Sequence, residues 1–266
     1  MILTRYEGRL LVVLQPDHGV QTGLIAAAWG NSEVPPPREH RRAGRLAATH
    51  HDDGWAVWER RPDIDPDTGA PIQFHQLKPP AHLTAYRAGI ERAAQTDPWA
   101  GLLVSMHGVG LYNDRYGSFR LVEQQFTEHE RALVEEFFTD MAALQSQLYE
   151  QAVGHAPSRP PHELPEVREE YLLLQIWDRL SLQYAFRHAA DGELAPVPGA
   201  DGATLTCLSR GRFELALDPY PFARDRVELP VTASVVEDRV YADPEDFLAA
   251  LAAAGQTVVE CVAVRR

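Results

Sequence analysis

The sequence predicts an α+β fold that is mainly helical. Between residues 15 and 190 most apolar residues recur at the spacing of amphipathic helices. After residue 190 the chain changes to short β-rich runs that Asp-Pro, Tyr-Pro and Gly separate. The start, ILTRY, a turn at Glu7-Gly8 and LLVVL, is typical of a β-hairpin over residues 2–14. We therefore expect a helical core over residues 1–190, hairpin included, with a β-rich region over residues 191–266 packed on it.

The helices can be placed one by one. Asp17 is a suitable N-cap for the first helix, which Gly30 ends. Its predicted apolar positions are Val20, Leu24, Ile25, Ala28 and Trp29. A second helix carries Leu46 and Ala47 and runs into the sequence HHDD. Further helices are predicted over residues 81–95, 99–112, 121–152, 165–188 and 243–255.

The C-terminal runs ATLTCL, RFELAL, VTASVV and QTVVECVAV have the composition of strands. They are expected to form a small antiparallel sheet, which the N-terminal hairpin can join. Residues 60–81, rich in Pro, Gly and Asp, predict a long irregular loop, and such loops are often functional.

Composition and charge exclude several classes of protein. A net charge of −13 lacks the basic footprint of a nucleic-acid-binding protein, although a bound metal can still attract a small anion. No run of eighteen apolar residues predicts a membrane span, and no secretory signal is recognised at the start. With only two cysteines, a reduced cytoplasmic protein is the simplest interpretation. The oligomeric state is left open, with a homodimer as one option.

Three ionisable residues stand where apolar or uncharged groups are expected. Asp178 has Leu174 and Leu182 one helical turn away on either side, so its carboxylate needs an arginine or a metal as partner. His107 lies on an equally apolar face, where it can be a ligand or a hydrogen-bonded core residue. His18 lies in the first turn of its helix, where the helix dipole favours the neutral, metal-binding form; it can also be a simple feature of the cap.

The stretch THHDDGW, residues 49–55, is the most concentrated candidate site. Adjacent side chains on a helix point about 100° apart, so only two neighbours can reach one metal. His51 and Asp52 are the predicted pair, which leaves His50 and Asp53 to orient ligands or carry protons; a solvated turn is the alternative. Imidazole and carboxylate together suit Mn, Fe, Co or Zn.

The order His18, His51-Asp52 and Asp178 resembles the H…HD…D signature of the HD-domain superfamily of metal-dependent phosphohydrolases. THHDDGW is similar to the helix-ending H-D-x-G motif of that superfamily, and IWDRLSL to its closing helix. The resemblance implies an HD-like helical bundle. In dinuclear members two further histidines are ligands, which implies His82 and His107 here, with His75 competing with His82.

The whole chain also resembles an uncharacterised bacterial family, through the segments QPDHGVQTG, HHDDGW, LLVSMHG and DPYPF. One departure from the HD pattern concerns Trp55, which stands where many HD hydrolases carry a phosphate-binding lysine. Lys78 or Arg115 can replace that charge. Trp55, Trp58 and Tyr112 then form an aromatic rim that suits a ring-containing substrate.

Three functions follow as hypotheses. The first is metal-dependent hydrolysis of a phosphoester of a small molecule or nucleotide, with Asp53 or His50 assisting and one or two divalent metals bound. Fe or Mn is expected first, and Zn, Co or Mg are the alternatives. The second is a di-iron oxygenase of the HD type, and the third is a non-catalytic metal-containing binding module.

Overall fold

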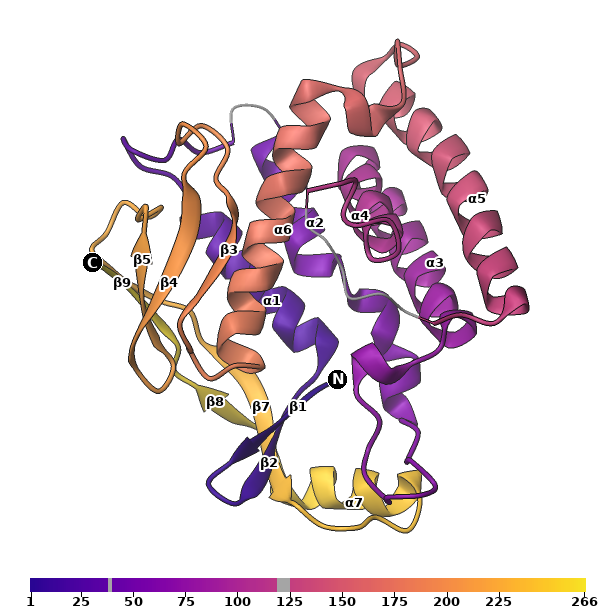
Figure 1. Cartoon of the computed structure of the whole chain (residues 1–266), viewed down its shortest axis with the longest axis vertical. Coiled ribbons are helices and arrows are strands. Elements are labelled where there is room, and N and C mark those ends of the chain that lie inside the picture. Colours follow the sequence, from indigo (N-terminus) through magenta and orange to yellow (C-terminus); the bar gives the residue numbers. More distant parts are fainter. Residues whose placement is uncertain (38–39, 119–124) are drawn as a thin grey trace.

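The computed structural model describes residues 1–37, 40–118 and 125–266, and these residues form an α+β fold (Figure 1). The α-helices are α1 (Gln15–Ala28), α2 (Arg41–His50), α3 (Pro79–Thr96), α4 (Pro98–Gly110), α5 (Glu128–Val153), α6 (Pro165–Ala185) and α7 (Pro244–Ala254). Short 3₁₀ segments are η1 (Asp53–Ala56), η2 (Trp58–Arg60), η3 (Phe74–Gln76) and η4 (Pro161–Glu163). The strands are β1 (Ile2–Tyr6), β2 (Arg9–Val13), β3 (Gly192–Pro196), β4 (Thr204–Gly211), β5 (Glu214–Asp218), β6 (Arg226–Glu228), β7 (Val231–Glu237), β8 (Thr257–Val259) and β9 (Val262–Arg265).

The helices lie close to the predicted ranges, because their apolar spacing is long and regular. The first four residues of the predicted helix 121–152 lie outside the described residues, and α5 begins at Glu128. None of the described helices is both long and apolar enough to cross a membrane. Cys207 and Cys261 are free and buried.

The strands form two sheets, and one of them is the predicted small antiparallel sheet with the N-terminal hairpin. The predicted hairpin β1–β2 pairs with β7 in an antiparallel sheet of order β1-β2-β7-β8. The second sheet has the order β3-β4-β5-β9-β6, and β5 runs parallel to β9. A parallel pair needs a long crossover, which the chain from β6 through β7, α7 and β8 supplies. Strands β5 and β9 are far apart in the sequence, so no local sequence pattern predicts that they pair.

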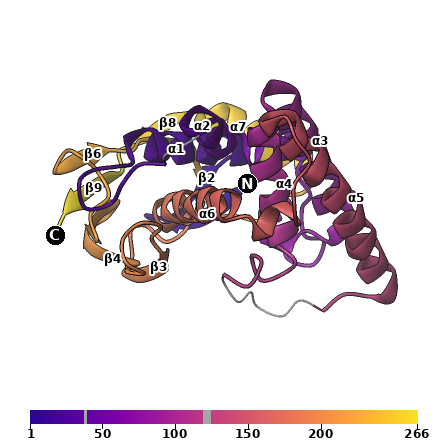
Figure 2. The same cartoon turned by 90° about the horizontal axis from the view of Figure 1, so that it is seen from above.

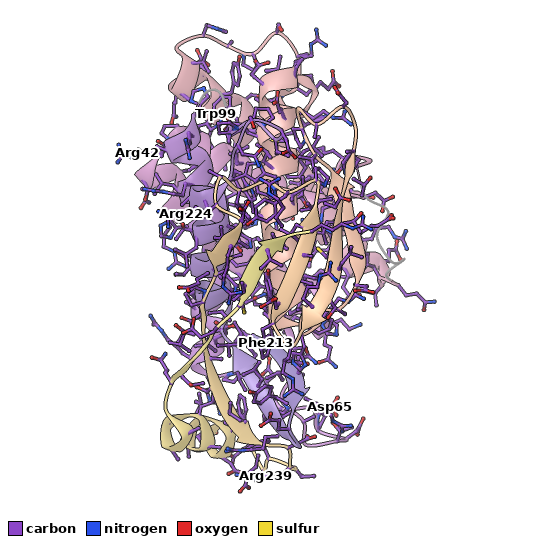
Figure 3. All side chains as sticks on the ribbon, turned by 90° about the vertical axis from the view of Figure 1, so that its left-hand side faces the viewer. Arg42, Asp65, Trp99, Phe213, Arg224 and Arg239 are labelled. Atoms are coloured by element: carbon purple, nitrogen blue, oxygen red, sulfur yellow. The ribbon has the colours of Figure 1, made fainter. Side chains whose placement is uncertain are left out.

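Helix α6 lies between the two halves of the molecule. Figures 1 and 2 show α4 on one side of α6 and strands β3 and β4 on the other. Helices α3, α4 and α5 pack together on the first side, and α1 contacts both α2 and α6. Seen from the side in Figure 3, the second sheet lies in front of the helices. Both the helical half and the β-rich half therefore reach α6.

An aromatic cluster joins the C-terminal region to two helices. Trp29, at the end of α1, makes edge contacts with Trp177 of α6 and with Phe222. The side chain of Asn31 donates hydrogen bonds to the carbonyl oxygens of Tyr220 and Phe222 at 2.7 and 3.0 Å. The DPYPF segment is thus anchored beside the helices that carry the candidate site.

Helix α1 buries a polar face, which corrects its predicted orientation. Val20 and Leu24 are 53% and 40% exposed, whereas His18, Gln21 and Thr22 are buried. Periodicity predicts that the apolar stripe faces the core. In α1 Ile25 and Trp29 are buried as predicted, but the polar residues face inward as well, because their side chains have buried partners on α6 and in the C-terminal region.

Two helix boundaries also differ from the predictions. Helix α1 begins at Gln15, so Asp17 lies in its first turn and is not the N-cap. Helix α2 ends at His50, and Asp52 leaves the helical conformation with φ −114° and ψ 13°. The HHDD sequence therefore spans the junction of α2 and η1, and the change of backbone direction there separates its four side chains.

Candidate metal centre

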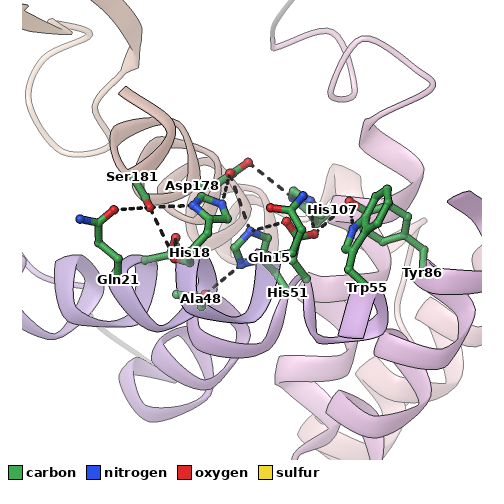
Figure 4. Close-up of polar contacts among 12 residues, drawn as sticks. Gln15, His18, Gln21, Ala48, His51, Trp55, Tyr86, His107, Asp178 and Ser181 are labelled. Carbon is green, nitrogen blue, oxygen red and sulfur yellow. Dashed lines mark hydrogen bonds and ion pairs between the residues drawn. The ribbon is translucent and has the colours of Figure 1, made fainter. Parts of the chain in front are cut away.

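Five buried ionisable side chains converge between helices α1, α4 and α6 and the α2–η1 junction (Figure 4). They are His18, His51, Asp52, His107 and Asp178. Within the described part of the chain, two groups have donor atoms that all lie within 4.8 Å of one another. One group is His18, His51 and Asp178, and the other is His51, Asp52 and His107. His51 belongs to both groups, so a single ion near it can reach donors from each.

The proton on His18 is fixed by a chain of hydrogen bonds. Gln21 donates from its amide to the carbonyl oxygen of Leu229 at 2.6 Å, which leaves its own carbonyl oxygen as acceptor for the Ser181 hydroxyl at 2.6 Å. Because that hydroxyl proton is used, Nδ1 of His18 must donate to Ser181 Oγ, 2.7 Å away. In the neutral ring Nε2 then carries a lone pair, and it lies 3.1 Å from Asp178 Oδ1.

His51 presents the same arrangement. Its Nδ1 donates to the carbonyl oxygen of Ala48 at 2.9 Å, which places the lone pair of the neutral ring on Nε2. Nε2 lies 3.4 Å from Asp52 Oδ2 and 3.7 Å from Asp178 Oδ1, and no described residue makes a hydrogen bond to it. A lone pair facing two carboxylates is repulsive, so either a proton or a metal ion must lie there.

The pKa shifts of His51 and Asp178 also indicate that a positive charge is favoured between them. Burial lowers the pKa of His51, but the Asp52 and Asp178 carboxylates outweigh it and raise the pKa to about 9. Burial raises the pKa of Asp178, yet the neighbouring His18 and His51 side chains hold it well below its ordinary value. Without metal, His51 is therefore protonated at neutral pH, and a metal ion must displace that proton.

His107 is held by Arg115, which lies 3.4 Å from its Nδ1 and can donate to it. Burial and the neighbouring charge of His51 lower the pKa of His107 well below its ordinary value, so the ring is neutral. With Nδ1 accepting, the proton is on Nε2, 3.7 Å from Asp52 Oδ1. In this tautomer the Nε2–H group faces the Asp52 carboxylate, so Nε2 has no lone pair to offer a metal ion. The donor set that fits a cation best is His18, His51, Asp52 and Asp178.

His82 lies apart from both donor groups. Its Nδ1 is 2.5 Å from the Tyr112 hydroxyl, and its ring packs against Trp55 and Tyr86. Burial lowers the pKa of His82 to about 4. His75 is exposed on η3 and is also absent from the two groups. The described residues thus bring five of the six predicted metal ligands into the two groups that could hold a metal ion, and His82 lies outside both.

His50 and Asp53 form a pair of their own. Nδ1 of His50 lies 2.8 Å from Asp53 Oδ2, and the side chains are 42% and 29% exposed. Arg92 donates to the backbone carbonyl of Asp53. Neither side chain lines the cavity beside the centre. Their catalytic roles stay predictions, and the structure brings them to each other and not to the ligands.

The cavity beside the centre has a volume of about 130 Å³. Its lining comprises the ligands His18, Asp52 and Asp178, the neighbours His107, Arg115, Tyr86, His82 and Gln15, and the side chains Phe74, His75, Leu111 and Leu182. Of the predicted substrate-binding residues, Arg115 is buried in this wall, and Tyr112 reaches it through His82.

Trp55 and Trp58, two residues of the predicted aromatic rim, and Lys78, one of the two predicted phosphate-binding charges, do not line the cavity. Trp55 is 1% exposed, and its indole donates to the Tyr86 hydroxyl, which itself donates to Asp52 Oδ1 at 2.9 Å. Trp55 thus helps to hold the candidate ligand Asp52 in place through the Tyr86 hydroxyl. Trp58 donates to Asp63, and Lys78 is exposed at the start of α3.

Sequence reasoning missed three residues that orient the candidate ligands, Ser181, Gln21 and Tyr86, and the cavity residue Gln15. A signal exists for two of them, because Ser181 follows Asp178 and Gln21 follows His18 by three residues. That spacing puts each on the same helix face as the candidate ligand. An uncharged polar residue at such a position is common, so the signal is weak.

Replacing Ser181 with Ala is expected to weaken metal binding by roughly 10- to 100-fold, the usual cost of removing a group that orients a ligand. Without the hydroxyl, Nδ1 of His18 loses its acceptor at 2.7 Å, and the competing tautomer turns an N–H toward the centre. Competition with a fluorescent chelator measures the affinity. Ser146→Ala, on the exposed face of α5, is the control, and an unchanged affinity in Ser181→Ala would contradict the hydrogen-bond assignment.

The metal-free protein is expected to lose stability as the pH rises from 6.5 to 9. The pKa of His51 is about 9 in the folded state, against an ordinary value of 6.5 in the unfolded chain. Its stabilising contribution is therefore complete below pH 6.5 and is lost as the pH passes through 9. The contribution is roughly 3 kcal/mol at most. Urea unfolding at several pH values tests this. The loss should be absent in His51→Gln, and a constant stability in the metal-free wild type would contradict it.

Comparison with protein-family models matches residues 1–238 to the family described as "Protein of unknown function (DUF3891)". Comparisons with curated proteins and with solved structures gave no match. The family match confirms the expectation of an uncharacterised family and assigns no activity. It begins at the first residue of the hairpin sheet and ends within the C-terminal region, so it includes every residue of the candidate centre. The chain belongs to the DUF3891 family.

Proposed function

We propose that this protein is a metal-dependent hydrolase that acts on a phosphoester of a small molecule. The observation that carries the proposal is His51 Nε2, which is buried, has no hydrogen-bond partner among the described residues, and faces two carboxylates. His18 adds a second lone pair beside Asp178. Two imidazoles and two carboxylates suit the divalent transition metals Fe, Mn, Co and Zn.

The residues present have defined tasks in such a centre. His18, His51, Asp52 and Asp178 would hold one divalent ion, whose Lewis acidity can bring the pKa of a water molecule near 7. Ser181 and Ala48 fix the tautomers of the two histidines. Tyr86 holds the Asp52 carboxylate. The order of these ligands along the chain also supports a hydrolase of the HD type.

The cavity separates this proposal from a structural metal site. A structural site is closed by its ligands, whereas a catalytic site keeps an open position. Here a space of about 130 Å³ touches three of the four ligands. The oxygenase alternative uses two irons and six ligands. It is less well supported, because His82 belongs to neither donor group and its Nδ1 makes a hydrogen bond with the Tyr112 hydroxyl.

The test is the metal content of protein purified without added metal, followed by phosphate release from a panel of phosphomonoesters. About one divalent ion per chain is expected, with hydrolysis that a chelator abolishes and added metal restores. Asp178→Asn serves as the inactive variant. Two irons per chain with dioxygen-dependent turnover would overturn the proposal, and so would metal-loaded protein that releases phosphate from no ester in the panel.

A further inference from the structure

Two buried polar atoms at the cavity have no hydrogen-bond partner among the described residues. One is Nε of Arg115, whose side chain is 9% exposed, and the other is Oε1 of Gln15, which is 2% exposed as a residue. Both residues line the cavity beside the centre. Buried polar groups are normally satisfied, so unsatisfied groups beside a space indicate a ligand that supplies the missing bonds.

Arg115 interacts with His107, Asp178 and the Tyr171 hydroxyl, and its Nε is left without a partner among the described residues. Its guanidinium lies 3.4 Å from His107 Nδ1 and 3.7 Å from Asp178 Oδ2, both long for hydrogen bonds. Guanidinium groups carry five N–H donors in a planar fork that matches phosphate and carboxylate oxygens. Arg115 can therefore bind an oxyanion in the cavity without leaving its present position.

The backbone around Arg115 is strained in a way that explains its placement. Asp114, Arg115 and Tyr116 have φ values of 55°, 53° and 54°, three consecutive non-glycine residues in the left-handed region. Each costs about 1–2 kcal/mol relative to the right-handed conformation. Hydrogen bonds hold the turn, from Arg115 N to the Gly110 carbonyl at 2.9 Å and from Ser118 Oγ to the Arg115 carbonyl at 2.7 Å. Strain of this kind concentrates at functional sites.

The charge balance makes an anion the favoured ligand once metal is bound. The centre presents two carboxylates, Asp52 and Asp178, and a divalent ion neutralises both. The positive charge of Arg115 is then left for the ligand. In the metal-free protein the two buried carboxylates lie beside the cavity without the divalent ion, and Asp178 Oδ2 is 3.7 Å from the Arg115 guanidinium, so the same cavity attracts an anion much less.

The size of the cavity limits what the anion can be. The cavity volume of about 130 Å³ is well below the roughly 300–1,000 Å³ of pockets that enclose a drug-sized ligand. It can take a single phosphoryl group and its ester oxygen, and it is too small to enclose a nucleoside as well. The exposed His75 in the lining marks the end of the cavity that meets solvent, so a larger leaving group has to extend past His75 and Phe74.

We infer that Arg115 forms, with Gln15 and the metal centre, a binding site for one terminal phosphoryl group of a phosphomonoester. The inference rests on the proposed function and adds the substrate class to it. Arg115 binds the phosphoryl oxygens, and the Gln15 carbonyl oxygen accepts a hydrogen bond from a protonated phosphoryl oxygen or from the alcohol that hydrolysis releases. The organic part of the ester lies outside the cavity. A phosphodiester carries organic groups on both sides of the phosphorus and would have to place both of them outside this cavity, so we expect it to bind less well than a monoester.

Calorimetric titration of inorganic phosphate into metal-loaded and metal-free protein tests this. The metal-loaded wild type should bind phosphate at least tenfold more tightly than the metal-free protein. Arg115→Met should lose at least tenfold of that affinity with unchanged metal content. Arg42→Met, which removes an exposed guanidinium from α2 (Figure 3), is the matched control and should bind phosphate as the wild type does.

The outcomes distinguish the two proposals. Failure of the wild type to bind a divalent ion would remove the proposed function itself. Normal metal content with equal phosphate affinity in Arg115→Met and wild type would overturn only the anion site. Because the turn is strained, Arg115→Lys and Gln15→Leu serve as further variants if Arg115→Met does not fold. Each should weaken phosphate binding, and wild-type affinity in both would contradict the assignment. Hydrolysis of a diester as fast as of its monoester would also overturn it.

Discussion

Replacing Asp52 with Asn is expected to lower metal affinity by more than about 100-fold, because loss of a ligand exceeds the 10- to 100-fold cost of losing a group that orients one. The substitution keeps the shape of the side chain and removes its charge. Asp52 is 5% exposed, accepts from Tyr86, and lies 3.4 Å from His51 Nε2. With an amide there, the only carboxylate left in the centre among the described residues is Asp178.

The adjacent aspartate provides the matched control. Asp53→Asn changes the same functional group one residue along the chain, where the side chain is 29% exposed and pairs with His50. Its metal affinity should stay within about threefold of wild type, since a partly exposed pair contributes little. Equilibrium dialysis with metal analysis measures both variants. Equal losses in the two variants would show that the assignment of Asp52 over Asp53 is wrong.

A second readout separates loss of the site from loss of the fold. In the metal-free state Asp52→Asn removes one of the carboxylates that raise the pKa of His51. The fall in stability between pH 6.5 and 9 should therefore become smaller in Asp52→Asn, and it should persist in Asp53→Asn. A variant that had simply unfolded would show no cooperative transition at any pH.

The buried residues of the candidate centre could be selected from the sequence because several of them break a local pattern. An aspartate between Leu174 and Leu182 on one helix face has few physical explanations, and metal coordination is one of them. His51 and Asp52 are separable from their neighbours because adjacent side chains diverge. The structure shows why the side chains of His51 and Asp52 point away from those of His50 and Asp53. Helix α2 ends at His50, and the backbone leaves the helical conformation at Asp52, before η1.

The sequence could not reveal which histidines share the centre. The prediction of His82 and His107 follows from their order along the chain, and order says nothing about distance in the fold. His107 lies in the centre, but Arg115 favours the tautomer that turns its N–H toward Asp52. The position of Arg115 depends on three left-handed residues that no composition rule predicts.

The inward polar face of α1 escapes sequence reasoning for a related reason. Periodicity separates an apolar stripe from a polar one, and the usual assignment puts the apolar stripe inside. Val20 and Leu24 face outward because His18 and Gln21 have partners on α6 and at Leu229. Those partners lie more than 150 residues away in the sequence, and only the folded chain shows them.

Replacing Gly54 with Ala is expected to destabilise the protein by about 3 kcal/mol or more, at the upper end of the cost of overpacking. A Cβ at Gly54 would lie 1.8 Å from the carbonyl oxygen of Ala85 and 3.0 Å from the backbone nitrogen of Gly89, so helix α3 would have to move. Backbone atoms cannot yield as a flexible side chain does. Asp52 is two residues away, and its hydroxyl donor Tyr86 is on the displaced helix.

Gly44→Ala is the control, since the same substitution is expected there to raise the free energy of unfolding instead of lowering it. Gly44 lies inside α2, and an added Cβ would meet its nearest neighbours at 3.7–4.0 Å, which is ordinary contact. Alanine there should raise the free energy of unfolding by about 0.5–1 kcal/mol, the helix penalty of glycine. Urea unfolding gives both values, and metal affinity reports on Asp52.

A small effect of Gly54→Ala on stability would mean that η1 and α3 are not in backbone contact. A large stability loss with unchanged metal affinity would mean that the α2–η1 junction holds Asp52 independently of α3. If both stability and affinity fall, the glycine that follows HHDD is required for a steric reason. It lets the backbone of the α2–η1 junction lie against α3, which keeps Tyr86 at 2.9 Å from the Asp52 carboxylate.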